Sequence, residues 1–329
     1  MITTMPKDVL TQIQQLLASD LNATNQIITG QLTSDVPIIQ TIAEYIVQSG
    51  GKRPRPLLVL LSANHFEYDG NEHHELAAII EFVHTATLLH DDVIDASELR
   101  RGRQTANQIW GNPVSVLVGD FLYSRAFQLL TQRGRVPIMQ VLAQTTNAIA
   151  EGEVSQLMYR HDPDIDEATY LDIIRRKTAC LFGAATQIGA MLGNSTSTQQ
   201  QAMADYGLHL GIAFQIVDDL LDYMADKSET GKNIGDDLVE GRTTLPLIYA
   251  LQHSSEQHTQ AIRNGIQKGS LDELNNILNA IDATNAKAYA LSIAEQHAIK
   301  ARDALKHLSD SVYKQTMEQL IEFVLQRRG

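Results

Sequence analysis

The sequence predicts an all-α protein, and three observations support that prediction. Nearly every segment repeats its apolar residues at the helical period, and no run alternates between apolar and polar as a half-buried strand would. Ala, Leu, Ile and Gln are abundant whereas aromatic residues make up only 5%, a composition that favours helix over sheet. Only eight prolines interrupt the 329 residues, so long helices have room to form.

The predicted helices follow one another along the chain. Ser34 to Pro37 resembles a helix start, and we expect that helix to end at Gly50–Gly51, because glycine adopts the left-handed conformation that closes helices. Pro56 suits the first turn of the next apolar helix. Ser270 to Glu273 has the spacing of a capping box, and amphipathic segments continue to Arg328. Apolar helices are expected in between, at about 75–95, 115–132, 137–159, 167–192, 200–224 and 243–252.

We expect one helical domain over residues 1–329, since no linker, low-complexity segment or repeat divides the chain. The formal charge of -13 argues against general affinity for nucleic acid or anionic membranes. The weakly polar stretch 178–193 is too short to span a membrane, and the N-terminus lacks a signal-peptide pattern. The single cysteine, Cys180, excludes an internal disulfide. A cytoplasmic location is therefore expected.

Two aspartate-rich motifs are the central feature of the sequence. The first is Asp91-Asp92-Val93-Ile94-Asp95, and the second is Asp218-Asp219-Leu220-Leu221-Asp222. Each ends an apolar helical stretch that should be buried, and its first and last aspartates are four residues apart, on one helix face. Carboxylates at this spacing repel one another, and Mg²⁺ bound with substrate phosphates would relieve the repulsion. A solvated acidic face is the alternative; the apolar flanks and the second copy favour metal binding.

Basic clusters stand out against the acidic background. They are Lys52-Arg53-Pro54-Arg55, Arg100-Arg101-Gly102-Arg103 and Arg175-Arg176-Lys177, with the loop Gly231 to Gly235 as a fourth candidate. Each alone is typical of a soluble surface. Beside carboxylates that hold a metal, however, they are suited to a diphosphate, which arginine binds through forked pairs of hydrogen bonds. The chain has no P-loop, HExxH or GxSxG motif, and His73 and His74 are expected to be surface residues.

These residues resemble the trans-type polyprenyl diphosphate synthases over almost the whole chain. The shared segments are Gly50-Gly-Lys-Arg-Pro-Arg-Pro56, His84 to Asp95, Arg100-Arg-Gly102, Gly119-Asp-Phe121, Gly152-Glu-Val154, Lys177-Thr178, Phe214 to Asp222 and Gly231-Lys-Asn-Ile-Gly-Asp236. The resemblance implies a bundle of long helices around a central cavity, of the isoprenoid synthase type, and usually a homodimer.

The resemblance also implies roles for individual residues. Asp91, Asp95 and Asp218 would hold Mg²⁺, with Asp222 nearby. Isopentenyl diphosphate would bind Lys52, Arg55, His84 and Arg101, and an allylic diphosphate would bind Arg100, Lys177 and Lys232. Thr178 and Gln215 would place oxygen dipoles beside the allylic cation, so Lys177, Thr178 and Gln215 are the expected catalytic residues. The reaction would proceed by ionisation, condensation and proton loss, with the departing pyrophosphate as base.

Side-chain size predicts a long product. Ala86 and Thr87 precede Asp91 by about one helical turn and should line the pocket that receives the growing chain. Both are small, whereas the short-chain relatives that the sequence resembles carry a bulky aromatic residue there. Leu130 and Leu142 are candidates for the floor of the pocket. The alternative is that Ala86 and Thr87 are ordinary helix-packing positions.

The resemblance implies a product of eight isoprene units, grown from farnesyl diphosphate and used in quinone side chains. Seven or nine units, or a geranylgeranyl product, remain open. A terpene cyclase would not need an acceptor site such as Lys52, Arg55 and His84. A non-catalytic partner subunit of a two-chain synthase should have degenerate aspartate-rich motifs, and both are intact here.

Overall fold

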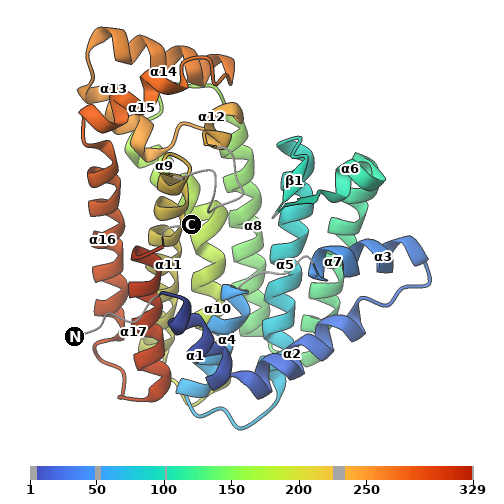
Figure 1. Ribbon diagram of the computed structural model, residues 1–329. Coiled ribbons are helices and arrows are strands. Elements are labelled where there is room, and N and C mark those ends of the chain that lie inside the picture. Colours follow the sequence, from blue (N-terminus) through green and yellow to red (C-terminus); the bar gives the residue numbers. More distant parts are fainter. Residues whose placement is uncertain (1–5, 49–52, 101, 225–233, 328–329) are drawn as a thin grey trace. The chain divides into compact units, whose positions relative to one another are not determined.

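The computed structural model describes residues 6–48, 53–100, 102–224 and 234–327, and these are almost entirely helical (Figure 1). The all-α prediction is confirmed. Within the described residues, β-structure is limited to the antiparallel pair β1 (Leu99–Arg100) and β2 (Arg103–Gln104). Strands of two residues are too short to produce an alternating pattern, so no periodicity predicts this hairpin. No helix in the described segments is both long enough and apolar enough to cross a membrane.

The chain divides into two compact units, each of which is described by itself. Unit 1 comprises residues 1–144, 184–204 and 308–317, and unit 2 comprises residues 145–183, 205–307 and 318–329. Each unit is assembled from three separate segments of the chain. The single domain and its central cavity stay predictions.

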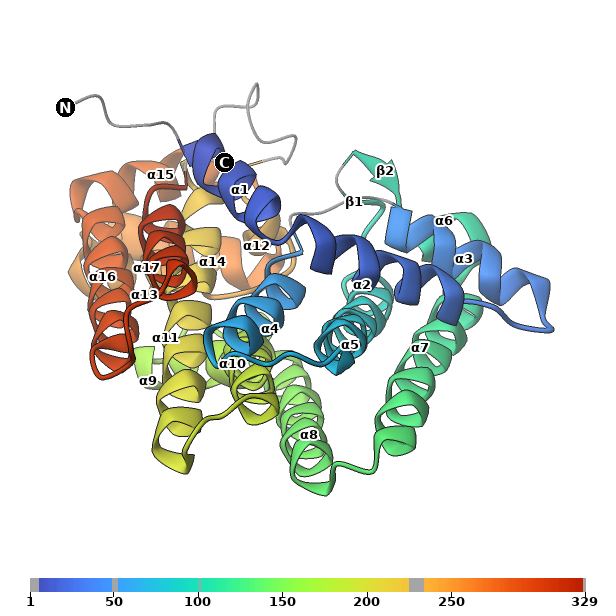
Figure 2. The same ribbon diagram turned by 90° about the horizontal axis from the view of Figure 1, so that it is seen from below.

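Unit 1 is built around one long buried helix, α5 (Glu72–Ile94). Helix α5 packs against α7 (Asn112–Arg133), α4 (Pro54–His65) and α2 (Ala18–Gln31), and the two views agree that α5 and α7 lie side by side (Figure 2). The unit also contains α1 (Pro6–Leu16), α3 (Pro37–Gln48) and α6 (Ala106–Trp110), most of α10 (Cys180–Leu192), and the first parts of α8 (Val136–Met158), α11 (Ser197–Leu221) and α17 (Val312–Leu325).

Unit 2 combines the remaining parts of α8, α10, α11 and α17 with a set of shorter helices. These are α9 (Glu167–Ile174), α12 (Asp236–Val239), α13 (Leu245–His253), α14 (Glu256–Lys268), α15 (Leu274–Ala283) and the longer α16 (Ala286–Leu305). Helix α13 packs against α14, α15 and α16 (Figure 1). Leu238, Leu247, Ile262, Ile277 and Ile281 form a buried apolar cluster there.

Most predicted helices are present within a few residues of their expected bounds. Helix α4 begins at Pro54, so Pro56 does lie in its first turn, whereas the expected stop at Gly50–Gly51 lies outside the described residues. The predicted capping box at Ser270 is wrong, because α15 begins only at Leu274. The amide of Ser270 donates to the carbonyl of Gly265, so Ser270 belongs to the closing turn of α14, which Gly269 ends at φ +58°.

A π-helical turn, η1 (Arg175–Ala179), interrupts the region 167–192, where one helix was expected. A π turn accommodates one more residue than an α turn and is often found at functional sites. Gly211 of α11 lies against it: a Cβ atom at this position would stand 2.7 Å from the Cα of Ala179. Glycine therefore lets α11 approach the π turn closely within unit 2.

Candidate functional site

The first aspartate-rich motif lies at the C-terminal end of α5, as predicted. Asp92 is only 4% exposed and accepts two hydrogen bonds from Arg100, from Nε at 2.9 Å and from Nη2 at 2.7 Å. Burial raises the pKa of Asp92, and the Arg100 guanidinium opposes that shift. Asp91 and Asp95 are half-buried instead. Carboxylates at this end of a helix face its negative pole, so a bound cation would stabilise them.

Arg100 lies in the hairpin β1–β2, which places its side chain beside Asp92 of α5. Arg100 was predicted to bind an allylic diphosphate, and the structure pairs its guanidinium with Asp92, just before the helix ends at Ile94. Thr105 closes the hairpin by donating its hydroxyl to the carbonyl of Ser97 at 2.6 Å. Arg101, which follows Arg100, lies outside the described residues.

Two of the four residues predicted to bind isopentenyl diphosphate lie together in unit 1. Nη1 of Arg55, on α4, is 3.1 Å from Nε2 of His84, on α5. Because a guanidinium can only donate, Nε2 of His84 is the acceptor, and a neutral His84 carries its proton on Nδ1. Arg55 is buried and His84 half-buried. The third residue, Lys52, lies outside the described residues, as Arg101 does.

The four residues predicted to limit product length also belong to unit 1. Ala86, Leu130 and Leu142 lie on α5, α7 and α8 and are fully buried. Thr87 is half-buried and donates its hydroxyl to the carbonyl of His84 at 2.8 Å. Buried side chains on α5, α7 and α8 fit the lining of a tunnel, and they fit ordinary packing equally well. Their role in setting the product length stays a prediction.

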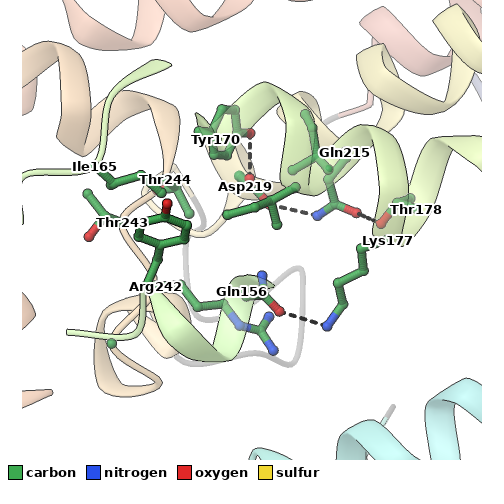
Figure 3. A pocket seen from close by; sticks show the side chains of 14 residues that line it. Gln156, Ile165, Tyr170, Lys177, Thr178, Gln215, Asp219, Arg242, Thr243 and Thr244 are labelled. Carbon is green, nitrogen blue, oxygen red and sulfur yellow. Dashed lines mark hydrogen bonds between the residues drawn. The ribbon is translucent and has the colours of Figure 1, made fainter. Parts of the chain in front are cut away.

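The second aspartate-rich motif ends α11 in the same way, with Asp222 just beyond the helix. Its middle residue, Asp219, is 6% exposed and accepts hydrogen bonds from the hydroxyl of Tyr170 at 2.6 Å and from Nε2 of Gln215 at 2.7 Å (Figure 3). Burial, and then the negative charge of Asp237, raise the pKa of Asp219 to about 8. In both motifs, the middle carboxylate is therefore held by the protein.

The outer aspartates of the second motif are half-buried and have different neighbours. Asp218 accepts a hydrogen bond from Nη2 of Arg327 at 3.1 Å, and the same guanidinium lies over the ring of Phe214, 4.3 Å from its centroid. Asp222 accepts the backbone amides of residues 236 and 237 at 3.2 Å each, and so caps α12. The role of Asp222 near a metal stays a prediction.

The π turn η1 presents Lys177 and Thr178, both of which were predicted to act on the allylic substrate. Lys177 Nζ lies 2.6 Å from Oε2 of Glu153 and 2.8 Å from Oε1 of Gln156. The Thr178 hydroxyl donates to Oε1 of Gln215 at 2.9 Å, which continues the hydrogen-bonded chain to Asp219 (Figure 3). The structure thus brings together all three predicted catalytic residues. Lys232 lies outside the described residues.

A small cavity adjoins this hydrogen-bonded chain in unit 2. It has a volume of about 60 Å³ and is lined by Lys177, Thr178, Gln215 and Asp219, and on its other side by Tyr170 and the segment 241–244 (Figure 3). This volume holds a few water molecules and no prenyl chain. The cavity is therefore too small to be the predicted pocket for the growing prenyl chain.

Four residues of the site were not predicted. Tyr170 and Gln156 hold Asp219 and Lys177, and neither belongs to a motif that could have signalled its role. Glu153 lies in the shared segment Gly152 to Val154, which was noted without a role. Arg327 could be recognised in the sequence only as one of two basic residues near the C-terminus. Its partner Asp218 is 109 positions away, so no local pattern could connect the two residues.

Comparisons with known proteins identify the family of the chain. The polyprenyl synthetase family model matches residues 36–284. Octaprenyl diphosphate synthase of Escherichia coli is 46% identical over 97% of this chain and 99% of its own length. Among solved structures, polyprenyl synthase of Caulobacter crescentus, complexed with calcium and isoprenyl diphosphate, has a TM-score of 0.93 at 40% identity and covers 97% of this chain and 98% of its own. A decaprenyl diphosphate synthase from Rhodobacter capsulatus has a TM-score of 0.92 at 42% identity, covering 97% and 99%.

Proposed function

The chain belongs to the polyprenyl synthetase family, and on this premise we propose that it is a magnesium-dependent prenyltransferase that adds isopentenyl diphosphate repeatedly to an allylic diphosphate. One observation carries the proposal. Two aspartate-rich motifs end two long helices, and in each motif the protein binds the middle carboxylate while the first and last are half-buried.

The outer carboxylates fit a magnesium ion. Mg²⁺ takes oxygen ligands, keeps several waters and uses few protein carboxylates beside substrate phosphates. Asp91 and Asp95 in unit 1 and Asp218 in unit 2 would hold the magnesium ions, each at the negative pole of a helix, where positive charge is favourable. Asp222 would act nearby. When bound, magnesium would neutralise the diphosphate oxygens and assist departure of pyrophosphate.

The basic residues divide between the two substrates. Arg55 and His84, with Lys52 and Arg101, would hold isopentenyl diphosphate, and the contact between Arg55 and His84 supports a joint role. Arg100, Lys177 and Lys232 would hold the allylic diphosphate. Asp92 orients Arg100, and Glu153 with Gln156 orients Lys177, so these two cations are positioned before substrate arrives.

Thr178 and Gln215 would stabilise the allylic cation. The hydroxyl proton of Thr178 is directed at Oε1 of Gln215, and the amide of Gln215 is directed at Asp219, so both oxygens are held in place by one hydrogen-bonded chain. Preorganised dipoles of this kind stabilise developing charge without reorganisation. The double bond of isopentenyl diphosphate would then attack the cation, and the departing pyrophosphate would accept the proton that is lost.

For the product, we propose eight isoprene units built from farnesyl diphosphate, which would serve quinone side chains. The similarity to the E. coli octaprenyl diphosphate synthase and the small residues Ala86 and Thr87 support this length. The structure from R. capsulatus is named a decaprenyl synthase, so overall similarity alone does not fix the number of units.

We further propose a cytoplasmic homodimer. The exposed apolar residues Val116 and Leu117 on α7, and Val154 and Met158 on α8, support a second copy as the partner. The single cysteine is compatible with a reducing compartment.

The test of the function uses the purified chain alone with farnesyl diphosphate, labelled isopentenyl diphosphate and MgCl₂, followed by chromatography of the dephosphorylated products. Wild type should give mainly the eight-unit alcohol. The double variant Asp91→Ala, Asp218→Ala should lose at least about 10³-fold in kcat, because charge stabilisation at the leaving group is removed. Asp303→Ala, an exposed aspartate of α16, serves as the matched control and should keep full activity.

Retained turnover in the double variant contradicts the assignment of the metal ligands. A wild-type chain that elongates farnesyl diphosphate only when a second polypeptide is added supports the partner-subunit alternative. Release of cyclised hydrocarbon without consumption of isopentenyl diphosphate supports a terpene cyclase.

A further inference from the structure

A cluster of one carboxylate and two imidazoles lies in unit 1, outside the residues that serve prenyl transfer. Asp20 belongs to α2, and His73 and His74 belong to the first turn of α5. One ligand atom from each side chain lies within 4.8 Å of the other two. The sequence had suggested two surface histidines. That expectation is wrong for His73, which is 4% exposed, and His74 is half-buried, because α2 packs across the beginning of α5.

The distances match those of a metal site. Nε2 of His74 is 3.0 Å from Oδ1 of Asp20, and Nε2 of His73 is 3.5 Å from the same oxygen. Two nitrogen or oxygen ligands on a tetrahedral zinc ion, each about 2.0–2.1 Å from the metal, are about 3.3 Å apart. The two distances to Asp20 bracket this value, and the ligand nitrogens of the two histidines lie within 4.8 Å of each other, so side-chain movements of about an ångström would suit an ion. Imidazole and carboxylate together are a donor set that suits zinc and its neighbours in the first transition series.

The surroundings favour coordination at Asp20. Oδ2 of Asp20 accepts a hydrogen bond from Asn64 at 2.9 Å, which fixes the carboxylate and leaves Oδ1 directed at the histidines. The nearby acids Glu72 and Glu75 already bind Arg135 and Arg133, respectively, and are not needed as ligands.

We propose that Asp20, His73 and His74 form a binding site for a divalent transition metal such as Zn²⁺, which joins α2 to the first turn of α5. Three protein ligands leave one position of a tetrahedral ion to water, on the side where Asp20 and His74 reach solvent. Nδ1 of His73 has no hydrogen-bond partner among the described residues, so only Asp20 has an outer partner that orients it. Hydrogen-bond partners that orient metal ligands typically raise the affinity for the metal 10- to 100-fold. Because the histidine His73 lacks such a partner in the described part of the chain, we expect a dissociation constant for zinc on the order of micromolar.

The test uses the full chain, produced without a histidine tag and stripped of metal with a chelator. The protein is titrated with ZnCl₂ by calorimetry. Excess MgCl₂ is present, so that the carboxylates proposed to bind magnesium are occupied. Wild type should bind one more zinc ion than His74→Gln. Saturating zinc should raise the melting temperature of wild type by about 5 °C and leave that of His74→Gln unchanged. Co²⁺ should give the visible absorption of a tetrahedral nitrogen–oxygen site in wild type alone.

Two further variants keep the result interpretable. Asp20→Asn should lose zinc binding, as His74→Gln does. The melting temperature of each variant, measured in the presence of chelator, shows whether the variant is folded. His253→Gln removes an exposed histidine of α13 and should bind zinc like wild type. Equal zinc stoichiometry and equal affinity in wild type, His74→Gln and Asp20→Asn would overturn the proposal. Prenyl transfer is not the readout, so failure here leaves the proposed function unaffected.

Discussion

The three aspartates of each aspartate-rich motif are chemically different residues in the folded chain. Asp92 and Asp219 are buried and bound by side chains of their own unit, whereas the outer aspartates are half-buried. A buried carboxylate needs hydrogen bonds to offset its desolvation, and Arg100 or Tyr170 supplies them. The middle aspartate is thus part of the protein's own hydrogen-bonded framework, and the outer aspartates are the ones that the proposed function assigns to magnesium.

At the residue scale, the first prediction concerns Ala86. Ala86→Phe should convert the enzyme to mainly short prenyl products, because an aromatic ring at this position of α5 would fill the pocket that the prediction assigns to the growing chain. Chromatography of the dephosphorylated products measures the change. Added volume in a packed core also costs about 1–3 kcal/mol, so the variant should melt earlier than wild type.

Ala86→Ser is the matched control, because it changes polarity with little change in volume. It should keep the long product. If Ala86→Phe folds and still makes the same products as wild type, then Ala86 is an ordinary packing position and the tunnel lies elsewhere.

The candidate site was largely predictable where a residue belongs to a compact motif. Asp91, Asp218, His84 and Lys177 are recognisable from their immediate neighbours in the sequence. Contacts that join distant segments were not predictable: Tyr170 meets Asp219 across 49 positions, and a lone tyrosine carries no sequence signal. For the same reason, the sequence could not show that Asp92 holds Arg100, since a hairpin of two-residue strands has no periodicity.

At the element scale, the π turn η1 determines how Lys177 and Thr178 are presented. Deleting Arg175, whose side chain is exposed, should allow the turn to close into a regular α-helix, because a π turn holds one additional residue. The hydrogen bond from Thr178 to Gln215 would then be lost. We expect kcat to fall at least about 100-fold while the helical content by circular dichroism is kept.

Arg175→Ala is the control for this deletion, since it removes the same side chain and its ion pair with Asp172 but keeps the chain length. Its kcat should stay within a few-fold of wild type, because an exposed ion pair contributes little. Equal losses in the two variants would show that the side chain matters and the π turn does not.

Helix existence could be predicted from apolar periodicity, but the helix interruptions could not. The period over 167–192 is that of a helix, and a π turn shifts it by only one residue, which a periodicity argument does not resolve. Ser270 shows the converse error: four residues had the right spacing for a cap, yet Gly269 made them part of a helix end.

A second element-scale prediction concerns the contact between α11 and α16 in unit 2. His209 and His297 lie with their Nδ1 atoms 3.0 Å apart, so at least one ring is neutral. Burial, and then the neighbouring His209 and Lys300, lower the pKa of His297 to about 4. The pKa of His209 is lowered too, by burial and by Lys300, while Asp205 opposes that shift.

Because the folded pKa is below the unfolded value of 6.5, the unfolded chain binds more protons between about pH 6.5 and pH 4, and stability falls as the pH decreases through this window. We expect a loss of roughly 1–2 kcal/mol after allowance for partial exposure. Urea denaturation at pH 7 and pH 5 measures it. His297→Gln should flatten the dependence, His253→Gln should not, and a wild-type free energy of unfolding that is equal at the two pH values would contradict the prediction.

At the scale of the whole molecule, the division into two units was not predictable. Each unit is assembled from three segments of the chain, so no linker or change of composition marks a boundary. The acidic charge of -13, in contrast, could be interpreted from the sequence alone. Against this negative charge, the basic side chains that we propose to bind diphosphate are a local exception, and the proposed magnesium ions would be favourable counterions.

The last prediction concerns assembly. Leu117 on α7 is 65% exposed and adjoins Val116, an apolar pair that a second copy of the chain would cover. Leu117→Glu should raise the dimer dissociation constant about 100-fold, because an unpaired carboxylate would be desolvated at the interface. Light scattering coupled to size-exclusion chromatography should then report the mass of one chain, where wild type reports two. Ile299→Glu, at an exposed apolar position of α16, should leave the dimer intact. A wild-type chain that elutes as a monomer, or a Leu117→Glu chain that stays dimeric at low micromolar concentration, would exclude this face as the interface.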